Sequence, residues 1–285
     1  MTHITKTHRV PVINLEMNVA YGCNLQCEYC SHLGRFMKGI VPLDELVHWY
    51  QSWNHKIQPR NVRIMGGEPL LHPQLETILY ETRCHWQDSD IELVTNGLLL
   101  PKMNPNVFFA LRGTGASVTM SKHFDDPHYN SMFQTGIEIL RTHGIDPHLT
   151  QSTGFWRKYY RINKQGNAHP YQSDPVKAWQ NCYVKYQCIT LLDNCLYRCP
   201  QLGCYSHAVQ HGFVSDDWKI VLGYRPLTPD CTQETLAAFM REEACEQCSI
   251  CPEEFEYADM YEKLNMFGLP LTRKIFCGDT IHDQT

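Results

Sequence analysis

The sequence predicts an α/β protein in which helices wrap a parallel sheet. Between about residues 10 and 155, five apolar, strand-like runs recur: VPVINLEMNV, NVRIMGG, IELVTNG, ASVTMS and DPHLTQST. Segments of helical periodicity, such as LDELVHWYQSW and SMFQTGIEILRTHG, lie between several of them. Strands that alternate with helices along the chain are typical of a parallel sheet. Glycine and proline near the strand ends indicate loops over one edge of this sheet.

The organisation of the chain changes after this region. Beyond residue 155 the alternation fades, aromatic residues, glycine and proline become frequent, and two groups of cysteines appear. With 285 residues, 43% of them hydrophobic, the chain can bury one large core and hold a second, smaller unit. We therefore predict a core domain over residues 1–165, with a soft boundary reaching to about 180, and a cysteine-rich domain over 180–285 that ends in a helix.

Composition and charge argue against two classes of partner. The formal net charge is −5 and there is no Lys/Arg-rich run, which argues against a nucleic-acid surface. No stretch approaches about 18 consecutive apolar residues, and the N-terminal segment lacks the apolar core of a signal peptide. We expect a cytoplasmic protein with neither a nucleic acid nor a membrane as partner.

The fourteen cysteines point to metal or redox chemistry, because disulfides are rare in a reducing cytoplasm. Eleven are grouped: three lie at 23–30, five at 182–204 and three at 245–251. The other three, Cys84, Cys231 and Cys277, are interpreted as buried free thiols.

The first group, Cys23, Cys27 and Cys30, follows the first predicted strand, at the edge where sites gather in folds of parallel strands. A zinc site or a rubredoxin-like iron site would use four ligands. Three thiolates can instead hold three irons of a 4Fe-4S cluster and leave the fourth iron for a small-molecule ligand. A zinc knuckle is the alternative.

The spacing C-x3-C-x2-C, with Tyr29 before the last cysteine, resembles the radical S-adenosylmethionine (radical SAM) superfamily. The resemblance implies that S-adenosylmethionine binds the open iron through its amino and carboxylate groups. An electron from the cluster then cleaves it to a 5′-deoxyadenosyl radical, while the protein positions the cofactor. It further implies a partial (β/α)6 TIM-like barrel, open where the substrate enters, with Tyr29 against the adenine and an electron donor such as flavodoxin or ferredoxin.

Other segments fit the same family in the expected order. MGGEP, at the end of the second predicted strand, looks like the GGEP motif that binds the methionine amino group. Its glycines, Gly66 and Gly67, would let the backbone approach a ligand, and Glu68 offers a carboxylate to an ammonium group. At the next two strand ends, the family places polar contacts to the cofactor. The candidates here are Asn96, Ser121, Lys122 and Gln151. Ordinary turn and loop roles are the alternative.

The tail resembles the SPASM or Twitch extension, a β-hairpin and helix that bind an auxiliary 4Fe-4S cluster. CITLLDNCLYRCP is interpreted as a hairpin, with Asn194 where the family has a glycine, a mild departure because asparagine tolerates the left-handed conformation. EEACEQCSICPEE would supply the other ligands. The chosen ligands are Cys188, Cys199, Cys245 and Cys248. The competitors are Cys251, Cys195, Cys182 and Cys204. A structural zinc site is the alternative.

Two reactions remain open. An auxiliary cluster could take an electron from the substrate radical, which makes the net reaction an oxidation. Alternatively, a thiol that ligates no iron, with Cys251 and Cys204 as candidates, could return a hydrogen atom in a redox-neutral epimerisation. We favour the oxidation, because a dedicated auxiliary cluster has its clearest purpose as an electron acceptor.

The substrate is expected to be a small polar metabolite such as a sugar, an aminocyclitol or an amino-acid derivative. The cysteine motif begins some twenty residues from the start, which leaves no room for a leader-binding domain. Glu16, in an otherwise apolar strand, and the His and Tyr residues of SKHFDDPHYN could meet such a substrate. Modification of a ribosomal peptide is the alternative, and a non-catalytic iron–sulfur or zinc scaffold is a more distant one.

Overall fold

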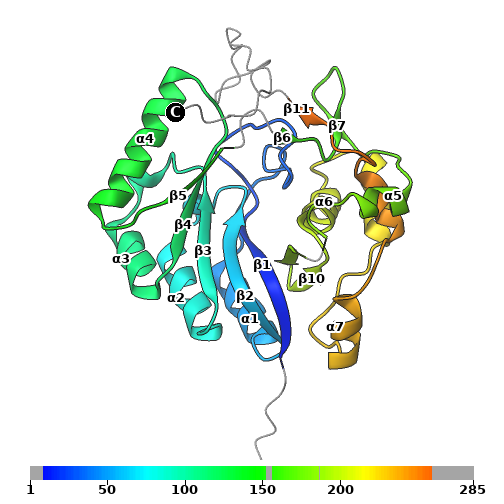
Figure 1. Cartoon of the computed structure of the whole chain (residues 1–285), viewed down its shortest axis with the longest axis horizontal. Helices are drawn as coiled ribbons and strands as arrows, with labels where there is room; N and C mark the ends of the chain where they lie inside the picture. Colours follow the sequence, from blue (N-terminus) through cyan, green and yellow to red (C-terminus); the bar gives the residue numbers. More distant parts are fainter. Residues whose placement is uncertain (1–8, 152–155, 186, 259–285) are drawn as a thin grey trace, which may run out of the picture.

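The computed structural model describes residues 9–151, 156–185 and 187–258. In this part of the chain, a seven-stranded sheet has the order β10-β9-β1-β2-β3-β4-β5 (Figure 1). Five neighbouring strands run parallel and match the five predicted runs: β1 (Val10–Ala20), β2 (Ile57–Gly66), β3 (Asp90–Thr95), β4 (Ser117–Lys122) and β5 (His148–Gln151). The predicted α/β class with a parallel sheet is confirmed.

Four helices connect these strands and follow the outer face of the sheet (Figure 1). They are α1 (Leu43–Trp53), α2 (Leu75–His85), α3 (Pro105–Thr114) and α4 (Pro127–Thr142). Helix α1 coincides with the predicted segment. Helix α4 begins before its predicted segment because the carboxylate of Asp126 accepts hydrogen bonds from the amides of His128 and Tyr129, and Pro127 suits the first helical position.

The predicted hairpin is present and joins the core sheet. Strand β9 (Ile189–Leu192) lies parallel to β1, and β10 (Cys195–Tyr197) pairs with β9 in the antiparallel direction. Its two turn residues, Asp193 and Asn194, have φ values of 50° and 57°, as a type I′ turn requires. The place beside β1 is therefore taken by this hairpin and not by another β/α unit.

The two faces of the sheet differ in chemistry. One row of register partners is completely buried in the core that the sheet shares with α1–α4: Leu191, Met17, Ile64, Leu93 and Val118. The neighbouring row, on the opposite face, is polar across the same strands: Thr190, Glu16, Arg63, Glu92 and Ser117. Strands that are buried on both faces are usually apolar throughout. The polar side chains on this inner face therefore indicate that it does not form a second hydrophobic core.

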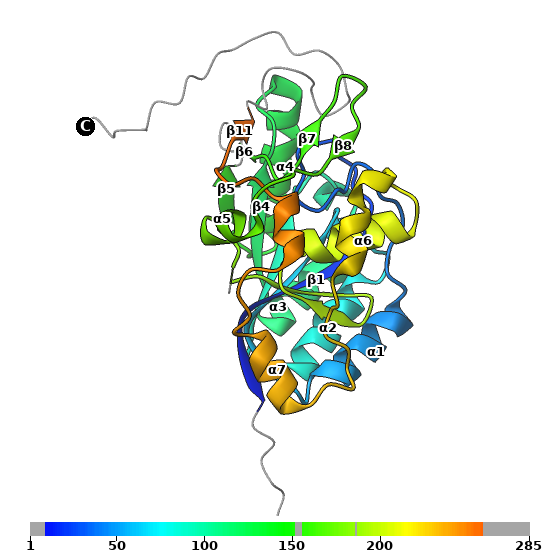
Figure 2. The same ribbon diagram turned by 90° about the vertical axis from the view of Figure 1, so that its right-hand side faces the viewer.

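The rest of the described chain gathers beyond β1 (Figures 1 and 2). It contains α5 (Pro175–Gln180), α6 (Pro200–Gln210), α7 (Gln233–Phe239), the strand pairs β6 (Trp156–Arg157) with β11 (Tyr257–Ala258) and β7 (Arg161–Ile162) with β8 (Ala168–His169), and the 3-10 helices η3 (Asp216–Gly223) and η4 (Glu246–Ile250). Two more 3-10 turns, η1 (Pro69–Leu71) and η2 (Leu100–Lys102), follow β2 and β3.

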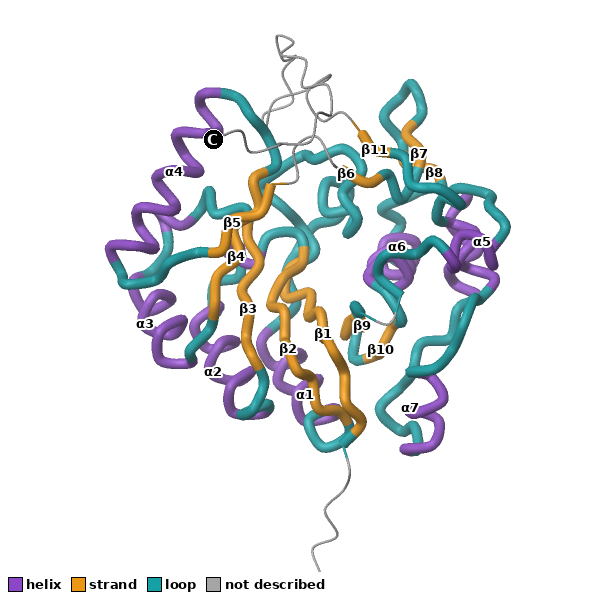
Figure 3. Tube along the Cα trace, in the orientation of Figure 1, coloured by secondary structure: helices purple, strands orange, loops and turns teal. Residues whose placement is uncertain are grey.

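Loops gather at the carboxyl ends of the parallel strands (Figure 3). None of the described helices is both long and apolar enough to span a bilayer. The helix predicted at the C-terminus and Cys277 fall in residues 259–285, outside the described residues. The domain boundary near residues 165–180 stays a prediction, although β9 and β10 show that the second region contributes strands to the core sheet.

Candidate active site

The thiols of Cys23, Cys27 and Cys30 lie together in the loop after β1. Burial raises the pKa of all three, and neighbouring thiolates of the triplet raise the pKa of Cys23 and Cys27 further. Gly34 closes the loop: a Cβ there would be 3.3 Å from the Cβ of Cys23 and 3.9 Å from the Sγ of Cys30. Three buried thiolates would repel one another unless a cation lay among them, so this donor set fits an iron–sulfur cluster.

The GGEP segment is tied to the chain that enters this loop. The amide of Gly67 donates to the carbonyl of Ala20 at 2.8 Å, and the amide of Glu68 donates to the carbonyl of Gly22 at 3.0 Å. A Cβ on Gly66, whose φ is 144°, would lie 2.1 Å from the Ala20 oxygen, and one on Gly67 would lie 2.0 Å from the Gly22 oxygen. These glycines therefore allow the GGEP segment to pack directly against the backbone at the end of β1. The sequence suggested a different role for them, the approach of the backbone to a ligand, which stays a prediction.

Glu68 is buried and joins the ends of β2 and β3. Its carboxylate accepts hydrogen bonds from the Thr95 hydroxyl at 2.5 Å, the Leu70 amide at 3.0 Å and the Asn96 amide at 2.9 Å. Burial raises the pKa of Glu68 to about 7, although these hydrogen bonds oppose the shift. The structure thus gives the carboxylate a positioning role, and its contact with an ammonium group stays a prediction.

Asn96 lies next to the cysteine triplet. Its Nδ2 donates to the Oδ1 of Asn24 at 2.8 Å and is 3.9 Å from the Sγ of Cys23. Ser121 is farther along the same edge of the sheet, and its hydroxyl is 3.0 Å from that of Thr150. These positions agree with cofactor contacts at neighbouring strand ends, which stay predictions. Lys122 pairs with Asp125 at 2.8 Å; Gln151 ends β5 beside Lys122, and its side chain is outside the described part.

Tyr29 is held at the side of the triplet loop by aromatic and cationic neighbours. Its ring centroid is 5.7 Å from that of Tyr160, and the Nζ of Lys158 is 5.5 Å from the Tyr29 centroid. By contrast, the residues of SKHFDDPHYN differ in exposure. Tyr129 is buried, and its hydroxyl accepts a hydrogen bond from the amide of the half-buried His123. Desolvation lowers the pKa of the His123 side chain to about 4, and His128 is exposed.

Five thiols from the second half of the chain gather near α5, α6 and η4: Cys182, Cys199, Cys245, Cys248 and Cys251. Burial raises the pKa of Cys199, and nearby thiolates at Cys251, Cys182 and Cys245 raise it further. A cavity of about 250 Å³ is lined by Cys182, Cys199 and Cys248, and a smaller one, of about 40 Å³, by the same three and Cys251.

Three other candidate cysteines lie elsewhere: Cys188, one of the four chosen ligands, and the competitors Cys195 and Cys204. Cys188, just before β9, is beside Glu16 and Arg63. Its pKa is raised mainly by burial and, to a lesser extent, by the negative charge of Glu16. Cys195 belongs to β10. Cys204 is buried in α6, and burial followed by the charges of Cys30, Glu16 and Cys199 raises its pKa. Cys204 thus lies between the triplet and the polar inner face, whereas Cys251 belongs to the second thiol group.

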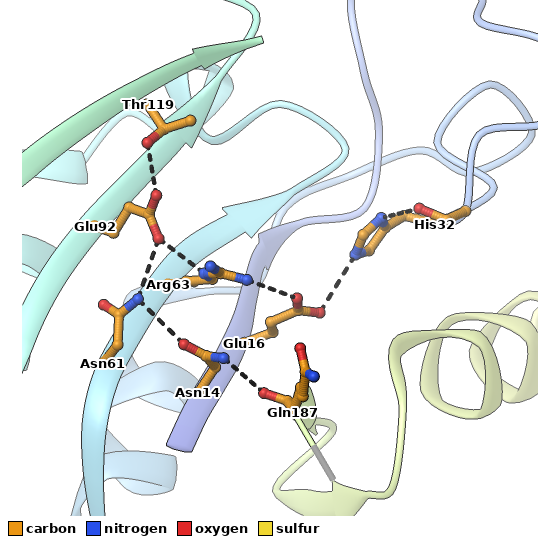
Figure 4. Close-up of polar contacts among 9 residues, drawn as sticks. Asn14, Glu16, His32, Asn61, Arg63, Glu92, Thr119 and Gln187 are labelled. Atoms are coloured by element: carbon orange, nitrogen blue, oxygen red, sulfur yellow. Dashed lines mark hydrogen bonds and ion pairs between the residues drawn. The ribbon is translucent and has the colours of Figure 1, made fainter. Parts of the chain in front are cut away.

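A network of polar side chains crosses the inner face (Figure 4). Arg63 donates from Nε to the carboxylate of Glu92 at 2.8 Å, and its Nη1 is 3.9 Å from the Oε1 of Glu16. The second oxygen of Glu16 is 3.9 Å from the Nε2 of His32, a residue of the triplet loop. Burial favours protonation of Glu92, but the Thr119 hydroxyl and the Arg63 charge outweigh it and lower the pKa.

Sequence reasoning singled out Glu16 but missed most of this network. The available signal was the alternation of Asn14, Glu16 and Asn18 in an apolar strand, which places three polar side chains on one face. Within the described residues, no group of three or more His, Cys, Asp or Glu side chains has the arrangement of a single-metal site.

Comparison with known proteins identifies the family. The model of the radical SAM superfamily matches residues 17–155, which contain the end of β1, the triplet, GGEP and β2–β5. The chain belongs to the radical SAM superfamily. Membership implies a 4Fe-4S cluster and S-adenosylmethionine, and the triplet is the donor set that fits that cluster.

The similar curated proteins include several GTP 3′,8-cyclases. The one from Staphylococcus saprophyticus is 33% identical over 108 residues, which cover 35% of this chain and 32% of that protein. The one from Trichormus variabilis is 30% identical over 147 residues, or 47% of this chain and 45% of that protein. The matches thus span less than half the length of these relatives.

Solved radical SAM structures show weaker similarity. The structure of BtrN in complex with AdoMet and 2-DOIA is 14% identical, with a TM-score of 0.46, and covers 86% of this chain and 98% of that chain. The structure of anSMEcpe with bound AdoMet and Cp18Cys peptide is 20% identical, with a TM-score of 0.40, and covers 49% of this chain and 42% of that chain.

Proposed function

We propose that this radical SAM enzyme abstracts a hydrogen atom from a small polar metabolite bound at the inner face of the sheet. The observation that carries the proposal is a contact between Cys204 and the inner face: its Sγ accepts a hydrogen bond from the Nδ2 of Asn18 at 3.3 Å. The charges of Cys30 in the triplet and of Glu16 on the inner face both raise the pKa of the same buried thiol. A 4Fe-4S cluster on the triplet supplies, with S-adenosylmethionine and one electron, a 5′-deoxyadenosyl radical. Reduced flavodoxin or ferredoxin is the proposed source of that electron.

The chain's own residues bind and orient the substrate. Glu16, Asn18 and Thr190 present polar atoms from β1 and β9, and all three side chains are buried, which keeps bulk water from the site. The substrate classes we propose are a sugar, an aminocyclitol or an amino-acid derivative. GTP, the substrate named for the curated relatives, fits the inner face less well. There, two carboxylates, Glu16 and Glu92, accompany one guanidinium, Arg63, so a triphosphate would meet like charge.

The direct test is the cleavage of S-adenosylmethionine. Protein reconstituted anaerobically with iron and sulfide, then given S-adenosylmethionine and dithionite, should form 5′-deoxyadenosine. A substrate deuterated at the reacting carbon should transfer its label to that product. Failure of the fully reconstituted protein to form 5′-deoxyadenosine would overturn the proposed function.

We also propose that the second thiol group holds an auxiliary 4Fe-4S cluster through Cys182, Cys199, Cys248 and Cys251. Support comes from the small cavity that these four residues line together. The set chosen from the resemblance to the SPASM or Twitch extension contained Cys188 and Cys245. Cys182 and Cys251 replace these two in the proposed set, because both line the small cavity, whereas Cys188 lies beside Glu16. A cluster here would accept the second electron of an oxidation.

Iron content separates these two ligand sets. The wild type should bind about 8 irons, four per cluster. Cys182→Ala should lose about 4 of them, whereas Cys188→Ala should keep them. Loss of iron from Cys188→Ala together with full iron in Cys182→Ala would favour the set that contains Cys188. Stoichiometric zinc in place of the second iron cluster would favour a structural zinc site.

The position of Cys204 favours a second candidate, a redox-neutral epimerisation. Cys204 lines neither of the two cavities beside the second thiol group, and its Sγ accepts a hydrogen bond from the Nδ2 of Asn18 at 3.3 Å. In this reaction, the substrate loses one hydrogen atom to the deoxyadenosyl radical and gains one from the Cys204 thiol. The thiyl radical left behind takes an electron from reduced flavodoxin or ferredoxin and a proton from solvent.

Turnover in D2O distinguishes the two reactions. An epimerisation should raise the product mass by one, because the thiol hydrogen exchanges with solvent, and Cys204→Ala should stop turnover while iron content stays at the wild-type level. An oxidation should give a product two hydrogens poorer, with no solvent deuterium at carbon. Full epimerisation by Cys204→Ala would show that Cys204 is not the donor.

A further inference from the structure

Four buried polar atoms on or beside the inner face have no hydrogen-bond partner among the described residues: Glu16 Oε2, Asn18 Oδ1, His32 Nε2 and Thr190 Oγ1. The exposed fractions of these residues are 5%, 2%, 9% and 0%. Buried polar groups are nearly always hydrogen-bonded, and leaving one unpaired costs free energy. Four in one place therefore suggest that a bound molecule completes their hydrogen bonds.

These atoms converge from three segments. Glu16 and Asn18 are two residues apart in β1, so their side chains leave the same face. Thr190 is the register partner of Glu16 on the neighbouring strand β9 and lies on that face as well. The Nε2 of His32 is 3.9 Å from the Oε2 of Glu16, too far for a hydrogen bond but close enough for a small group to contact both (Figure 4).

Glu92 on the same face provides the contrast. One of its oxygens accepts from the Thr119 hydroxyl at 2.6 Å, and the other accepts from Asn61 at 3.2 Å and Arg63 at 2.8 Å. Arg63 thus donates its close hydrogen bond to Glu92 and is 3.9 Å from Glu16. Glu92 has the contacts of a structural carboxylate, whereas the charge of Glu16 is only partly balanced.

The chemistry of the unpaired atoms selects the group that they would bind. The ionised carboxylate of Glu16 and the carbonyl oxygen of Asn18 are acceptors only, and the hydroxyl of Thr190 can also accept. A primary ammonium group brings three donors and a positive charge, which matches these acceptors and the only partly balanced carboxylate of Glu16. A phosphate or carboxylate would bring acceptors and negative charge to the same place.

We propose that Glu16, Asn18 and Thr190 bind a primary ammonium group of the substrate, and that the enzyme therefore acts on a hydroxylated small amine. The inference rests on the proposed function and narrows its substrate class. It also explains why the site is next to Cys204 and the triplet: the ammonium group anchors the substrate beside the residues that surround the reacting C–H bond.

Thermal unfolding tests whether Glu16 serves the ligand or the fold. Glu16→Gln keeps the size of the side chain and removes a buried charge that is only partly balanced, so its melting temperature should equal or exceed that of the wild type. Glu92→Gln is the matched control on the same face, and it should melt about 2–4 °C lower or more, because it loses a fully used acceptor. A fall in the melting temperature of Glu16→Gln as large as that of Glu92→Gln would assign Glu16 to the fold and overturn the proposal.

Binding tests the ligand class. D-glucosamine, D-galactosamine and serinol serve as probes, each compared with its N-acetyl counterpart, against reconstituted protein with S-adenosylmethionine. The amines should bind at least about tenfold more tightly, equivalent to about 1.4 kcal/mol. Glu16→Gln should abolish this preference, while Glu138→Gln, an exposed charge change on α4, should retain it.

The remaining outcomes count against the proposal. They are a preference for the acetylated or a phosphorylated sugar, no binding of any amine by the wild type, and an amine preference that survives in Glu16→Gln. Formation of 5′-deoxyadenosine by the same wild-type preparation, measured without any probe, keeps the two questions apart. If it forms but no amine binds, the ammonium site fails and the proposed function stands.

Discussion

Replacing Cys23, Cys27 and Cys30 together by Ala is expected to abolish the formation of 5′-deoxyadenosine. The three thiols lie in one loop next to the GGEP segment, with Cys27 buried and the other two half-buried, and no other described thiol lies within that loop. The second thiol group lies near α5, α6 and η4 and uses none of these residues. The variant should therefore keep about 4 of about 8 irons, measured by iron analysis alongside the cleavage assay.

Cys84→Ala is the matched control for this triple variant. The sequence-based interpretation of Cys84 as a buried thiol is wrong, because the structure places it exposed on α2. Its replacement should therefore change neither the iron content nor the rate of cleavage. Cleavage that persists in the triple variant would refute the assignment of the cluster to this loop. Loss of all iron from the triple variant would show that the two thiol groups do not assemble their clusters independently.

Gly67→Ala is expected to have the second largest effect, although Gly67 itself supplies no side chain to the site. The added Cβ would lie 2.0 Å from the carbonyl oxygen of Gly22 and 2.6 Å from that of Tyr21. Both are backbone atoms of the two residues that directly precede Cys23. Relief requires a shift of the triplet loop or of the GGEP segment. Overpacking of this kind costs roughly 1–3 kcal/mol of stability, and a displacement of about 1 Å at a reacting centre can cost about 100-fold in rate.

Both effects are measurable on one preparation. Gly67→Ala should lower the melting temperature and reduce the rate of 5′-deoxyadenosine formation by about 100-fold or more. Gly113→Ala is the control: it lies within α3, and its nearest new contact is the Tyr80 hydroxyl at 3.3 Å, the tip of a side chain that can move. It should leave the rate unchanged. A cleavage rate for Gly67→Ala within a few-fold of the wild type would show that the glycine contact does not position the loop.

Features with a local signal were predictable from the sequence. Helix α1 coincides with the predicted LDELVHWYQSW because its apolar positions recur at helical spacing, and the five parallel strands follow the five predicted apolar runs. The turn at Asp193 and Asn194 was predictable because few residues accept positive φ at two successive positions. The spacing of Cys23, Cys27 and Cys30 indicated the family because these three candidate ligands lie within one short loop.

The ligand set that we propose for the tail depends on the tertiary structure. Cys182 and Cys188 are only six residues apart, and their spacing did not distinguish them. Because β9 pairs with β1, Cys188 is carried to Glu16, while Cys182 is left beside Cys199 at the start of α6. Where a hairpin joins a sheet depends on the surface that it buries there. That surface forms only when distant segments of the chain come together, so the spacing of the cysteines does not reveal it.

By itself, the sequence of this protein determined the order of its strands and helices, the triplet loop and the alternation of polar residues in β1. Only the tertiary structure decided that Glu68 ties β3 to the GGEP segment and that Glu16 meets Thr190, 174 positions later, as partners in neighbouring strands. Local patterns report the conformation of nearby residues. Contacts between distant segments depend on which faces pack together. Hydrophobic burial is non-directional and would stabilise many pairings of faces, so the observed pairing depends on the fold of the whole chain.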